Sequence, residues 1–326
     1  MTKLKFLHVC NKIGEGTKSA MKEYPRRSGM YNWLYVFQGD MKPYDEVDDF
    51  EKYDVVQLNM SPVDCIMIPE IKRKIPESSS TMLVLNNDYV AESWGALNWH
   101  PKEYENYQRM GDMVFGTEPH QTSCMIDGAY TIPHPTNIKR LKKVGVKSYY
   151  PEDNKVGFMY HWWEHKTYPS SLLGFKLKEK YGIRTRIYAY DGKQDESARW
   201  AKVMFDEHIP GLDYPDYVNH LLSNKFLVEL SSCHTYGRNS VDTAALGIPT
   251  MGTDRVYSMA KCFPNMVADP FDFKSQMSVA DKIMKGGKWL DEQMSIASDA
   301  CEYFNYDNSK KRFLDALDES RKRLGK

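Results

Sequence analysis

The residues best suited to chemistry lie in one stretch of the chain, Ser231–Thr250, which opens with a polar loop. A helix is predicted directly after this loop, over Ser240–Leu246. Backbone N–H groups and the positive end of a helix dipole favour an anion at such a position. Asp242 falls within the first turn of the predicted helix, so its carboxylate can point back toward a bound ligand. The candidate binding residues are Gly237, Arg238, Asn239, Ser240 and Asp242.

Local signals place this loop between a strand and a helix. Before it, Phe226–Leu230 is a short apolar run of strand type. After it, the alanine-rich helix is stopped by Gly247 and Pro249. Such corners are also common in α/β proteins that bind nothing there, so an ordinary corner is the alternative.

The same alternation of short apolar runs and helical stretches extends along the chain. Strands are predicted at Leu4–Cys10, Trp33–Phe37, Tyr53–Leu58, Met82–Leu85, Met113–Phe115, Ala129–Ile132, Val156–Tyr160 and Thr185–Tyr190. Helices are predicted at Pro101–Met110, Leu172–Tyr181, Tyr214–Leu222, Lys274–Lys285, Trp289–Tyr303 and Ser309–Arg323. This order predicts an α/β fold with doubly wound parallel sheets, in which ligands bind beyond the carboxyl ends of the strands.

A polar segment, Tyr149–Asn154, predicts a linker between two domains. With 326 residues, of which 41% are hydrophobic, the chain is long enough for two cores. We expect an N-terminal domain over residues 1–150 and a C-terminal domain over residues 151–305, followed by a final helix within 306–326.

The composition excludes several classes of protein. Lys+Arg and Asp+Glu are both 44, so the overall charge does not indicate a nucleic-acid or membrane coat. Six cysteines without a C-x-x-C pair indicate reduced thiols rather than a zinc site or a disulfide framework. The N-terminus does not read as a signal peptide, and no apolar run approaches the ~20 residues of a membrane span. We therefore expect a cytoplasmic protein.

A second glycine loop follows the first predicted strand. Gly14 and Gly16 would let a ligand approach the backbone closely. The loop is not an ATPase phosphate loop, because Thr17 separates Gly16 from Lys18 and breaks the required spacing. A plain turn between strand and helix is the alternative.

The stretch Ser231–Thr250 resembles the donor-site motif of GT-B glycosyltransferases, especially the retaining, family 4-like enzymes. That motif is a Glu, seven residues, a second Glu, and soon Gly-x-Pro. His234 stands where the family has the first Glu, near the donor sugar, and Asp242 stands where the second Glu binds the ribose. Gly247-Ile-Pro249 completes the pattern.

Weaker similarities cover nearly the whole chain. The resemblance implies that Lys166 and His161 bind the donor diphosphate, at the places of a Lys and an Arg in the family. It also implies that the Gly14–Gly16 loop faces the donor phosphates. Asp213 and Tyr214 are candidates for holding the base. Asn87 and Asp88 stand at a family His-Asp pair and are candidate acceptor contacts. The last helix would cross back to the N-terminal domain.

The resemblance implies two doubly wound domains facing a cleft and a retaining transferase that uses a nucleotide-sugar. Cations at the diphosphate would stabilise the leaving group. There is no D-x-D motif, so we expect no metal, and no cofactor besides the nucleotide-sugar co-substrate. Two alternatives stay open: a sugar-nucleotide epimerase with His8 or His134 as its base, and a non-catalytic relic that keeps the nucleotide pocket.

The acceptor is indicated only by a basic cluster. Within nine residues, and with no acidic residue among them, the chain has Lys139, Arg140, Lys142, Lys143 and Lys147. They follow the loop that is expected to face the cleft. Lys142 and Lys143 are candidate contacts for an anionic acceptor, either a lipid or a nucleic acid. Some viral GT-B enzymes glycosylate hydroxymethylated DNA bases, which would place the protein in host cytoplasm. A glycan acceptor, or a solvated helix face without a ligand, is the alternative.

Overall fold

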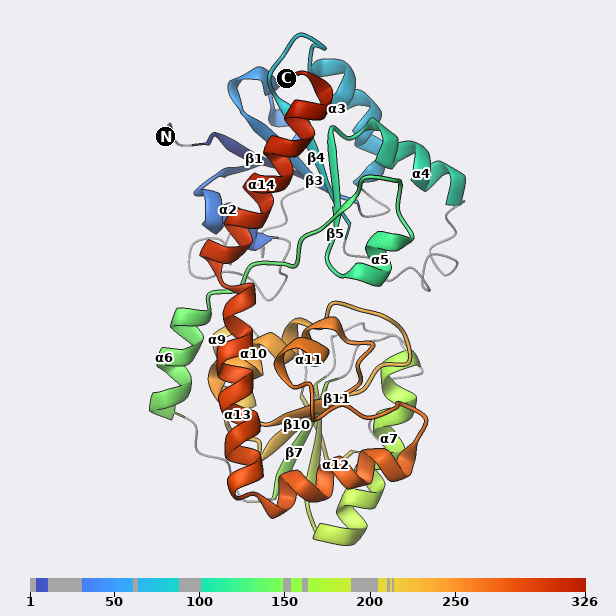
Figure 1. Ribbon diagram of the computed structural model, residues 1–326, viewed down its shortest axis with the longest axis vertical. Coiled ribbons are helices and arrows are strands. Elements are labelled where there is room, and N and C mark those ends of the chain that lie inside the picture. Colours follow the sequence, from blue (N-terminus) through green and yellow to red (C-terminus); the bar gives the residue numbers. More distant parts are fainter. Residues whose placement is uncertain are drawn as a thin grey trace. The chain divides into compact units, whose positions relative to one another are not determined.

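The structure is a computed structural model that describes residues 4–10, 31–60, 64–87, 101–148, 154–159, 164–188, 205–209, 212 and 214–326. For residues 101, 146–148 and 164–171 only the backbone is described. The chain divides into two compact units (Figure 1). The first unit comprises Met1–Thr136 and Tyr306–Lys326, and the second comprises Asn137–Asn305.

The first unit is built on a six-stranded parallel sheet with strand order β2-β1-β3-β4-β5-β6. Its strands are β1 Phe6–Cys10, β2 Asp40–Pro43, β3 Val55–Asn59, β4 Met82–Asn87, β5 Met113–Gly116 and β6 Tyr130–Thr131. Its α-helices are α2 Asn32–Phe37, α3 Ile68–Lys74, α4 Pro101–Met110, α5 Pro119–Ser123 and α14 Tyr306–Leu324. Short 3-10 turns are η2 Tyr44–Glu46, η3 Phe50–Lys52 and η4 Cys65–Met67.

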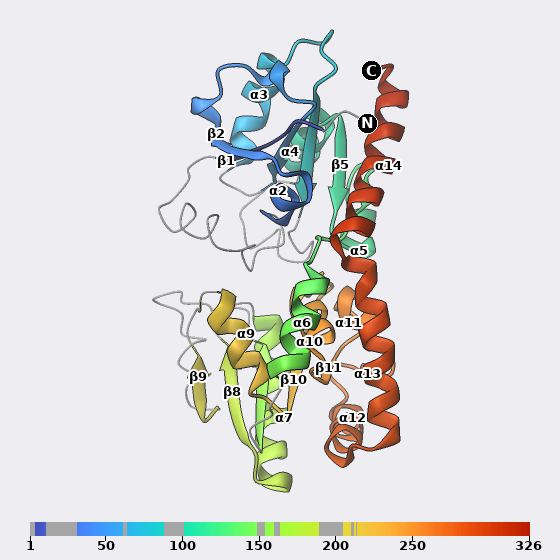
Figure 2. The same cartoon turned by 90° about the vertical axis from the view of Figure 1, so that its left-hand side faces the viewer.

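Both faces of this sheet are covered, because successive residues of each strand point to opposite faces. Leu7 and Val56 join a core with Ile71 of α3 and Tyr104 of α4. The alternate strand residues join a second core with α2 and α14, as Phe6, Val55, Trp33 and Phe313 do. Helix α14 passes in front of the sheet in Figure 1 and lies beside β5 in Figure 2. The unit is therefore doubly wound.

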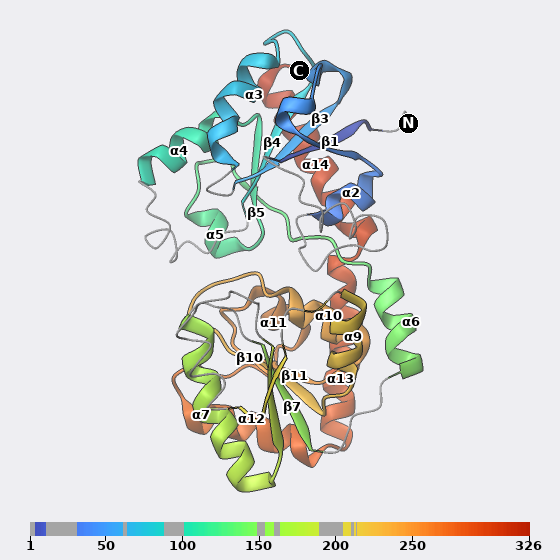
Figure 3. The ribbon, with the colours of Figure 1, turned by 180° about the vertical axis from the view of Figure 1, so that it is seen from behind.

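The second unit has a five-stranded parallel sheet with strand order β11-β10-β7-β8-β9. Its strands are β7 Lys155–Met159, β8 Arg184–Tyr188, β9 Glu207–Ile209, β10 Phe226–Glu229 and β11 Thr250–Gly252. Its helices are α6 Ile138–Ser148, α7 Glu164–Tyr181, α9 Tyr214–Leu222, α10 Arg238–Leu246, α11 Tyr257–Cys262, α12 Phe273–Lys285, α13 Lys288–Ala300 and the 3-10 turn η6 Cys301–Phe304. These helices surround the sheet (Figure 3) and share one core with it.

The second unit begins at Asn137, earlier in the chain than the boundary expected at residue 150. The reason is the packing of α6 on α10. A Cβ atom at Gly145 would lie 2.2 Å from the carbonyl oxygen of Leu246, so the two helices touch backbone to backbone there. Lys142 adds hydrogen bonds of 2.7 Å to the Ser298 carbonyl and to the Glu302 carboxylate.

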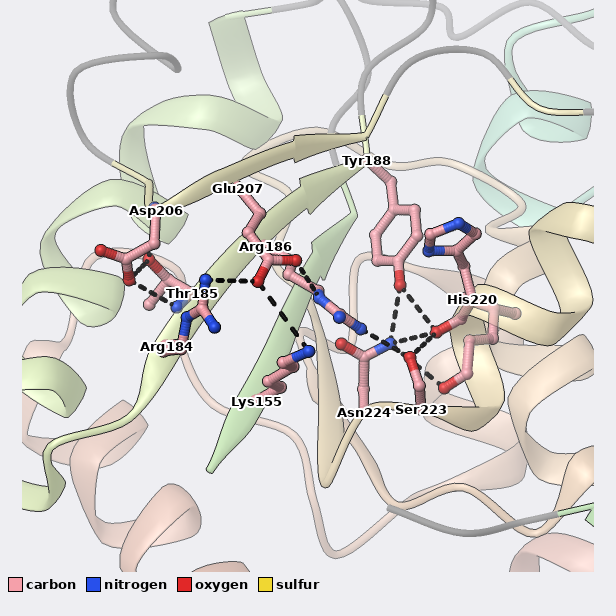
Figure 4. A network of polar contacts seen from close by, with 11 residues as sticks. Lys155, Arg184, Thr185, Arg186, Tyr188, Asp206, Glu207, His220, Ser223 and Asn224 are labelled. Carbon is pink, nitrogen blue, oxygen red and sulfur yellow. Dashed lines mark hydrogen bonds and ion pairs between the residues drawn. The ribbon is translucent and has the colours of Figure 1, made fainter. Parts of the chain in front are cut away.

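A polar network ties together the amino ends of the strands of the second sheet (Figure 4). Glu207 on the edge strand β9 accepts a 2.5 Å hydrogen bond from the buried Arg186 and lies 3.0 Å from Arg184. Arg186 also donates to Ser223, beyond α9. At the same end, Asn224 donates to the Tyr188 hydroxyl at 2.7 Å. Lys155 of β7 lies 4.0 Å from Glu207, so the network links β7, β8 and β9 to the turn that precedes β10.

Several local expectations differ from the structure. Trp33–Phe37, expected as a strand, is the core of α2. In a run of five apolar residues, periodicity cannot distinguish a strand from a helix. Here Trp33 and Phe37, four positions apart, both pack against Phe313. The strands β2, β9 and β11 were not expected, because their short sequences contain no run of apolar residues.

Among the described residues, no helix combines the length and apolarity that crossing a membrane requires. Within the same residues, no group of three or more His, Cys, Asp or Glu side chains is arranged so that it could hold a metal ion.

Candidate functional site

The candidate site is at the carboxyl end of β10, where the chain turns into α10 at Gly237. This residue has φ 74° and ψ 64°, a left-handed conformation that favours glycine. A Cβ atom there would lie 2.0 Å from Cγ1 of Val256. The Ser258 hydroxyl donates to the Gly237 carbonyl from the same side. Both the backbone angle and the close packing therefore require glycine.

The loop that leads to Gly237 is held by backbone hydrogen bonds to the segment after β11. The Thr235 N–H donates to the Arg255 carbonyl at 3.0 Å, and the Tyr257 N–H donates to the Thr235 carbonyl at 2.9 Å. The Ser258 N–H donates to the Tyr236 carbonyl at 3.0 Å. These bonds position the loop before any ligand binds. His234, immediately before them, is half-buried.

The sequence predicted Asp242 in the first turn of the helix, but the structure places it after that turn. Helix α10 begins at Arg238, because Arg238 and Asn239 already continue the helix after the left-handed Gly237. The Asp242 side chain is only 1% exposed, and one carboxylate oxygen lies 3.5 Å from Nε of Arg238. Its carboxylate therefore faces the protein interior beside a guanidinium.

Glu229 is a buried carboxylate that the sequence patterns did not predict as part of the site. It ends β10 and accepts hydrogen bonds from Oγ of Ser240 at 2.5 Å and from Nδ2 of Asn239 at 3.1 Å. A carboxylate under the first turn of a helix is favoured by the helix dipole. The signal in the sequence was the single acidic residue within the apolar run Phe226–Leu230.

Two tyrosines of α9 complete the surroundings of the helix start. The Tyr217 hydroxyl donates a 2.6 Å hydrogen bond to Oδ1 of Asn239. The Arg238 guanidinium lies over the ring of Tyr214, 5.5 Å from its centre. Asn239 and Ser240 thus have side-chain partners inside the protein, while Arg238 brings a positive charge to the start of α10. The Arg238 guanidinium, beside the Asp242 carboxylate, and the backbone N–H groups of the first turn place positive charge and donors at this helix start.

The remaining expected donor and catalytic residues are only partly described. Gly14, Gly16, Asp88, His161 and Asp213 lie outside the described residues. Lys166 is the third residue of α7, directly after β7, and only its backbone is described. The structure therefore places Tyr214, His234 and the 237–242 group in one unit.

The expected acceptor residues belong to different units. Asn87 is buried at the end of β4 in the first unit. Burial alone would lower the pKa of the Lys142 ammonium, but the hydrogen bond to Glu302 and the neighbouring acidic groups together raise it above its ordinary value. Lys143 is exposed on α6, as are Lys139 and Arg140. Lys142 is therefore not one of the exposed cations of this cluster.

Burial lowers the pKa of His8, one of the two histidines considered as a base, to about 4. His8 is therefore neutral at physiological pH and is not a base poised near pH 7. The other histidine, His134, is also buried.

No family model matches the sequence, and no curated protein matches it. Solved structures match its fold. One is an alpha-glucosyltransferase in complex with UDP and a 13-mer DNA containing a central A:G mismatch (TM-score 0.66, 11% identity, 96% of this chain and 99% of that chain). Another is an alpha,alpha-trehalose 6-phosphate synthase from Burkholderia multivorans (TM-score 0.66, 6% identity, 98% and 99%). A third is a glycosyltransferase involved in Avilamycin A biosynthesis (TM-score 0.59, 14% identity, 99% and 98%). Together with the two doubly wound units, these matches show that the chain has a GT-B glycosyltransferase-like fold.

Proposed function

We propose that this protein transfers a sugar from a nucleotide-sugar donor to the hydroxyl group of an acceptor. The observation that carries the proposal is the Gly237 turn, which starts α10 at the carboxyl end of β10 with Arg238 in its first turn. In parallel sheets this edge is where ligands bind. Structural neighbours with the same fold are glycosyltransferases, one of them in complex with UDP.

The donor diphosphate would bind at the start of α10, in the second unit. The backbone N–H groups of the first turn and the Arg238 guanidinium would meet its negative charge. Lys166, at the start of α7, would add a second cation. Since the leaving diphosphate gains negative charge in the transition state, these groups would lower the barrier to transfer. Retention of configuration, independence of metal ions and the absence of a cofactor are further parts of the proposal.

Asp242 has a revised role in this proposal. Because its carboxylate lies beside Arg238, it would orient that guanidinium as well as, or in place of, accepting the ribose hydroxyls. His234 would lie closer to the sugar, since it is in the loop before the Gly237 turn.

The proposed acceptor class rests on the exposed cations of α6. Lys139 and Lys143 are exposed on α6, and a structural neighbour is in complex with DNA. We therefore place nucleic acid first among the acceptors to be tested, ahead of glycans and anionic lipids.

A panel of sugar nucleotides and their free diphosphates, titrated by calorimetry, tests the donor site. At least one nucleoside diphosphate should bind, and hydrolysis of its sugar conjugate should continue in excess EDTA. Loss of hydrolysis that magnesium or manganese restores would contradict metal independence. Absence of binding across the whole panel would contradict the donor site itself.

A further inference from the structure

The first sheet carries a row of polar side chains on one face, from the middle of β1 and β3 to the carboxyl ends of β3 and β4. His8 of β1 is the register partner of Gln57 of β3, and Asn59 is the register partner of Asn86 of β4. Since side chains alternate along a strand, Gln57 and Asn59 share a face. That face is the one that α2 and α14 cover, because Phe6 and Val55 belong to the same core as those helices.

A chain of hydrogen bonds determines which of these polar atoms already have partners. Nδ2 of Asn86 donates to Oδ1 of Asn59 at 3.1 Å. That assignment leaves Nδ2 of Asn59 as the donor toward Nε2 of His8, 3.4 Å away. The neutral imidazole must then carry its proton on Nδ1. Burial supports the neutral form, because it lowers the pKa of His8 to about 4.

The next atoms along this row are buried but have no hydrogen-bond partner. They are Nδ1 of His8, Nε2 and Oε1 of Gln57, and Oδ1 of Asn86. The three side chains are at most 1% exposed. Buried polar groups in native proteins are nearly always hydrogen-bonded, so a row of unsatisfied ones indicates a bound group.

The chemistry of these atoms selects the kind of group. His8 Nδ1 and Gln57 Nε2 are donors, whereas Gln57 Oε1 and Asn86 Oδ1 are acceptors. None of the four carries a charge, so nothing in the row offsets the cost of bringing in an anion. A hydroxyl group, which donates one hydrogen bond and accepts two, is complementary to this mixture.

We propose that His8, Gln57 and Asn86 form a binding site for neutral hydroxyl groups, supplied by a sugar or polyol or, in its absence, by ordered water. The sugar source rests on the proposed function, because a transferase needs an acceptor hydroxyl. The water source does not, since enclosed polar sites hold ordered water in many proteins.

Nuclear magnetic resonance of the full chain with ¹⁵N-labelled histidine tests the proposal. The His8 signal is assigned by its loss in His8→Asn. Titration with methyl α-D-glucopyranoside should shift the Nδ1–H signal, whereas inorganic phosphate should leave it unchanged. Without glycoside, a magnetisation transfer from water to Nδ1–H should be seen. A glycoside effect identifies the sugar as a source, and a water effect alone identifies water.

Gln57→Leu removes both unsatisfied amide atoms while keeping the approximate shape, and it should weaken the glycoside response at least tenfold. Gln108→Leu is the matched control, because Gln108 is equally buried but already accepts from the Ile126 N–H. Gln57→Met serves if Gln57→Leu does not fold. A response to phosphate, or no response to either glycoside or water, would overturn the proposal. Calorimetry of diphosphate binding on the same samples tests the donor site separately.

Discussion

At Gly237 the backbone turns with φ 74°, and Val256 leaves no room for a side chain. These two constraints can be separated by mutation. The left-handed conformation penalises any other residue by about 1–2 kcal/mol, whatever the space around it. The contact with Val256 adds a steric cost that depends on one methyl group.

We therefore expect Gly237→Ala to destabilise the protein strongly and to abolish diphosphate binding. In a Val256→Ala background the Cγ1 clash is absent, so the same change should cost only about 1–2 kcal/mol. Urea unfolding of the four proteins measures this coupling. Equal costs in both backgrounds would show that Val256 does not restrict the turn.

Asp242 presents a choice between a ligand contact and a partner for Arg238. The structure favours the partner, because the side chain is 1% exposed and 3.5 Å from Nε of Arg238. We expect Asp242→Ala to lower the free energy of unfolding by about 3 kcal/mol, as breaking a buried ion pair does. Asp254→Ala, an exposed carboxylate after β11, is the control and should change stability little. If Asp242→Ala keeps the parental stability but loses diphosphate binding, the carboxylate contacts the nucleotide directly.

His8 makes stability depend on pH. Its pKa is lowered from 6.5 to about 4 in the folded state, so the unfolded chain binds the proton more readily. Its contribution is complete above pH 6.5 and is lost as the pH falls toward 4. The loss should approach about 3 kcal/mol. Urea unfolding between pH 7.5 and 4.5 should therefore show a smaller acid loss for His8→Gln than for the parent. His120→Gln, which leaves His8 in place, should retain the parental loss.

At the scale of elements, buried polar side chains join neighbouring strands and helices. Glu229 of β10 accepts hydrogen bonds from Ser240 and Asn239 in the first turn of α10. Asn239 in turn accepts a hydrogen bond from Tyr217 of α9. At the opposite end of the same sheet, Glu207 holds the edge strand β9 through Arg186 (Figure 4). These hydrogen bonds fix neighbouring strands and helices to one another, and so they help to position the site residues on them.

The Glu207 network predicts a stability effect away from the candidate site. In Glu207→Gln the buried Arg186 and its neighbour Arg184 lose their shared carboxylate. We expect a loss of about 2 kcal/mol in the free energy of unfolding, typical of a hydrogen bond to a charged group. Glu179→Gln breaks an exposed pair with Lys176 and should change stability by less than about 1 kcal/mol. Equal effects of the two changes would mean that the network does not stabilise β9.

At the scale of the whole molecule, the balanced charge leaves only local patches to attract an anionic acceptor. The exposed cations of α6 are such a patch. The lysines of α6 do not all have the same role. Lys142 is bound to Glu302 and stabilises the packing of α6, whereas Lys139 and Lys143 are exposed. A change of both exposed lysines therefore tests acceptor binding without removing this contact.

If nucleic acid is the acceptor, Lys139→Ala with Lys143→Ala should weaken duplex DNA binding and flatten its dependence on salt, because fewer counterions are released. Lys285→Ala, an exposed cation on α12, should leave binding at the parental level. Fluorescence anisotropy between 50 and 300 mM salt measures both. No binding by the parent at low salt would remove DNA and leave glycans, lipids or small molecules as acceptors.

The sequence by itself determined the fold class and most of the elements. Short apolar runs such as Phe226–Leu230 and Met82–Leu85 are confirmed as parallel strands, because buried strands need continuous apolar residues. The helix stop at Gly247 is confirmed as well, by a left-handed φ of 77°. The GT-B resemblance, based on residue spacing, is confirmed at the level of the fold.

Only the tertiary structure decided which side chains face a ligand and which face the core. Spacing could not show that Asn239 and Ser240 turn toward the buried Glu229, or that Asp242 pairs with Arg238. Nor could it show that Lys142 is held by Glu302, 160 positions away. Local sequence sets backbone preferences, but the partner of a polar side chain depends on elements distant in the chain. That dependence is why the fold was predictable from the sequence and the orientation of these side chains was not.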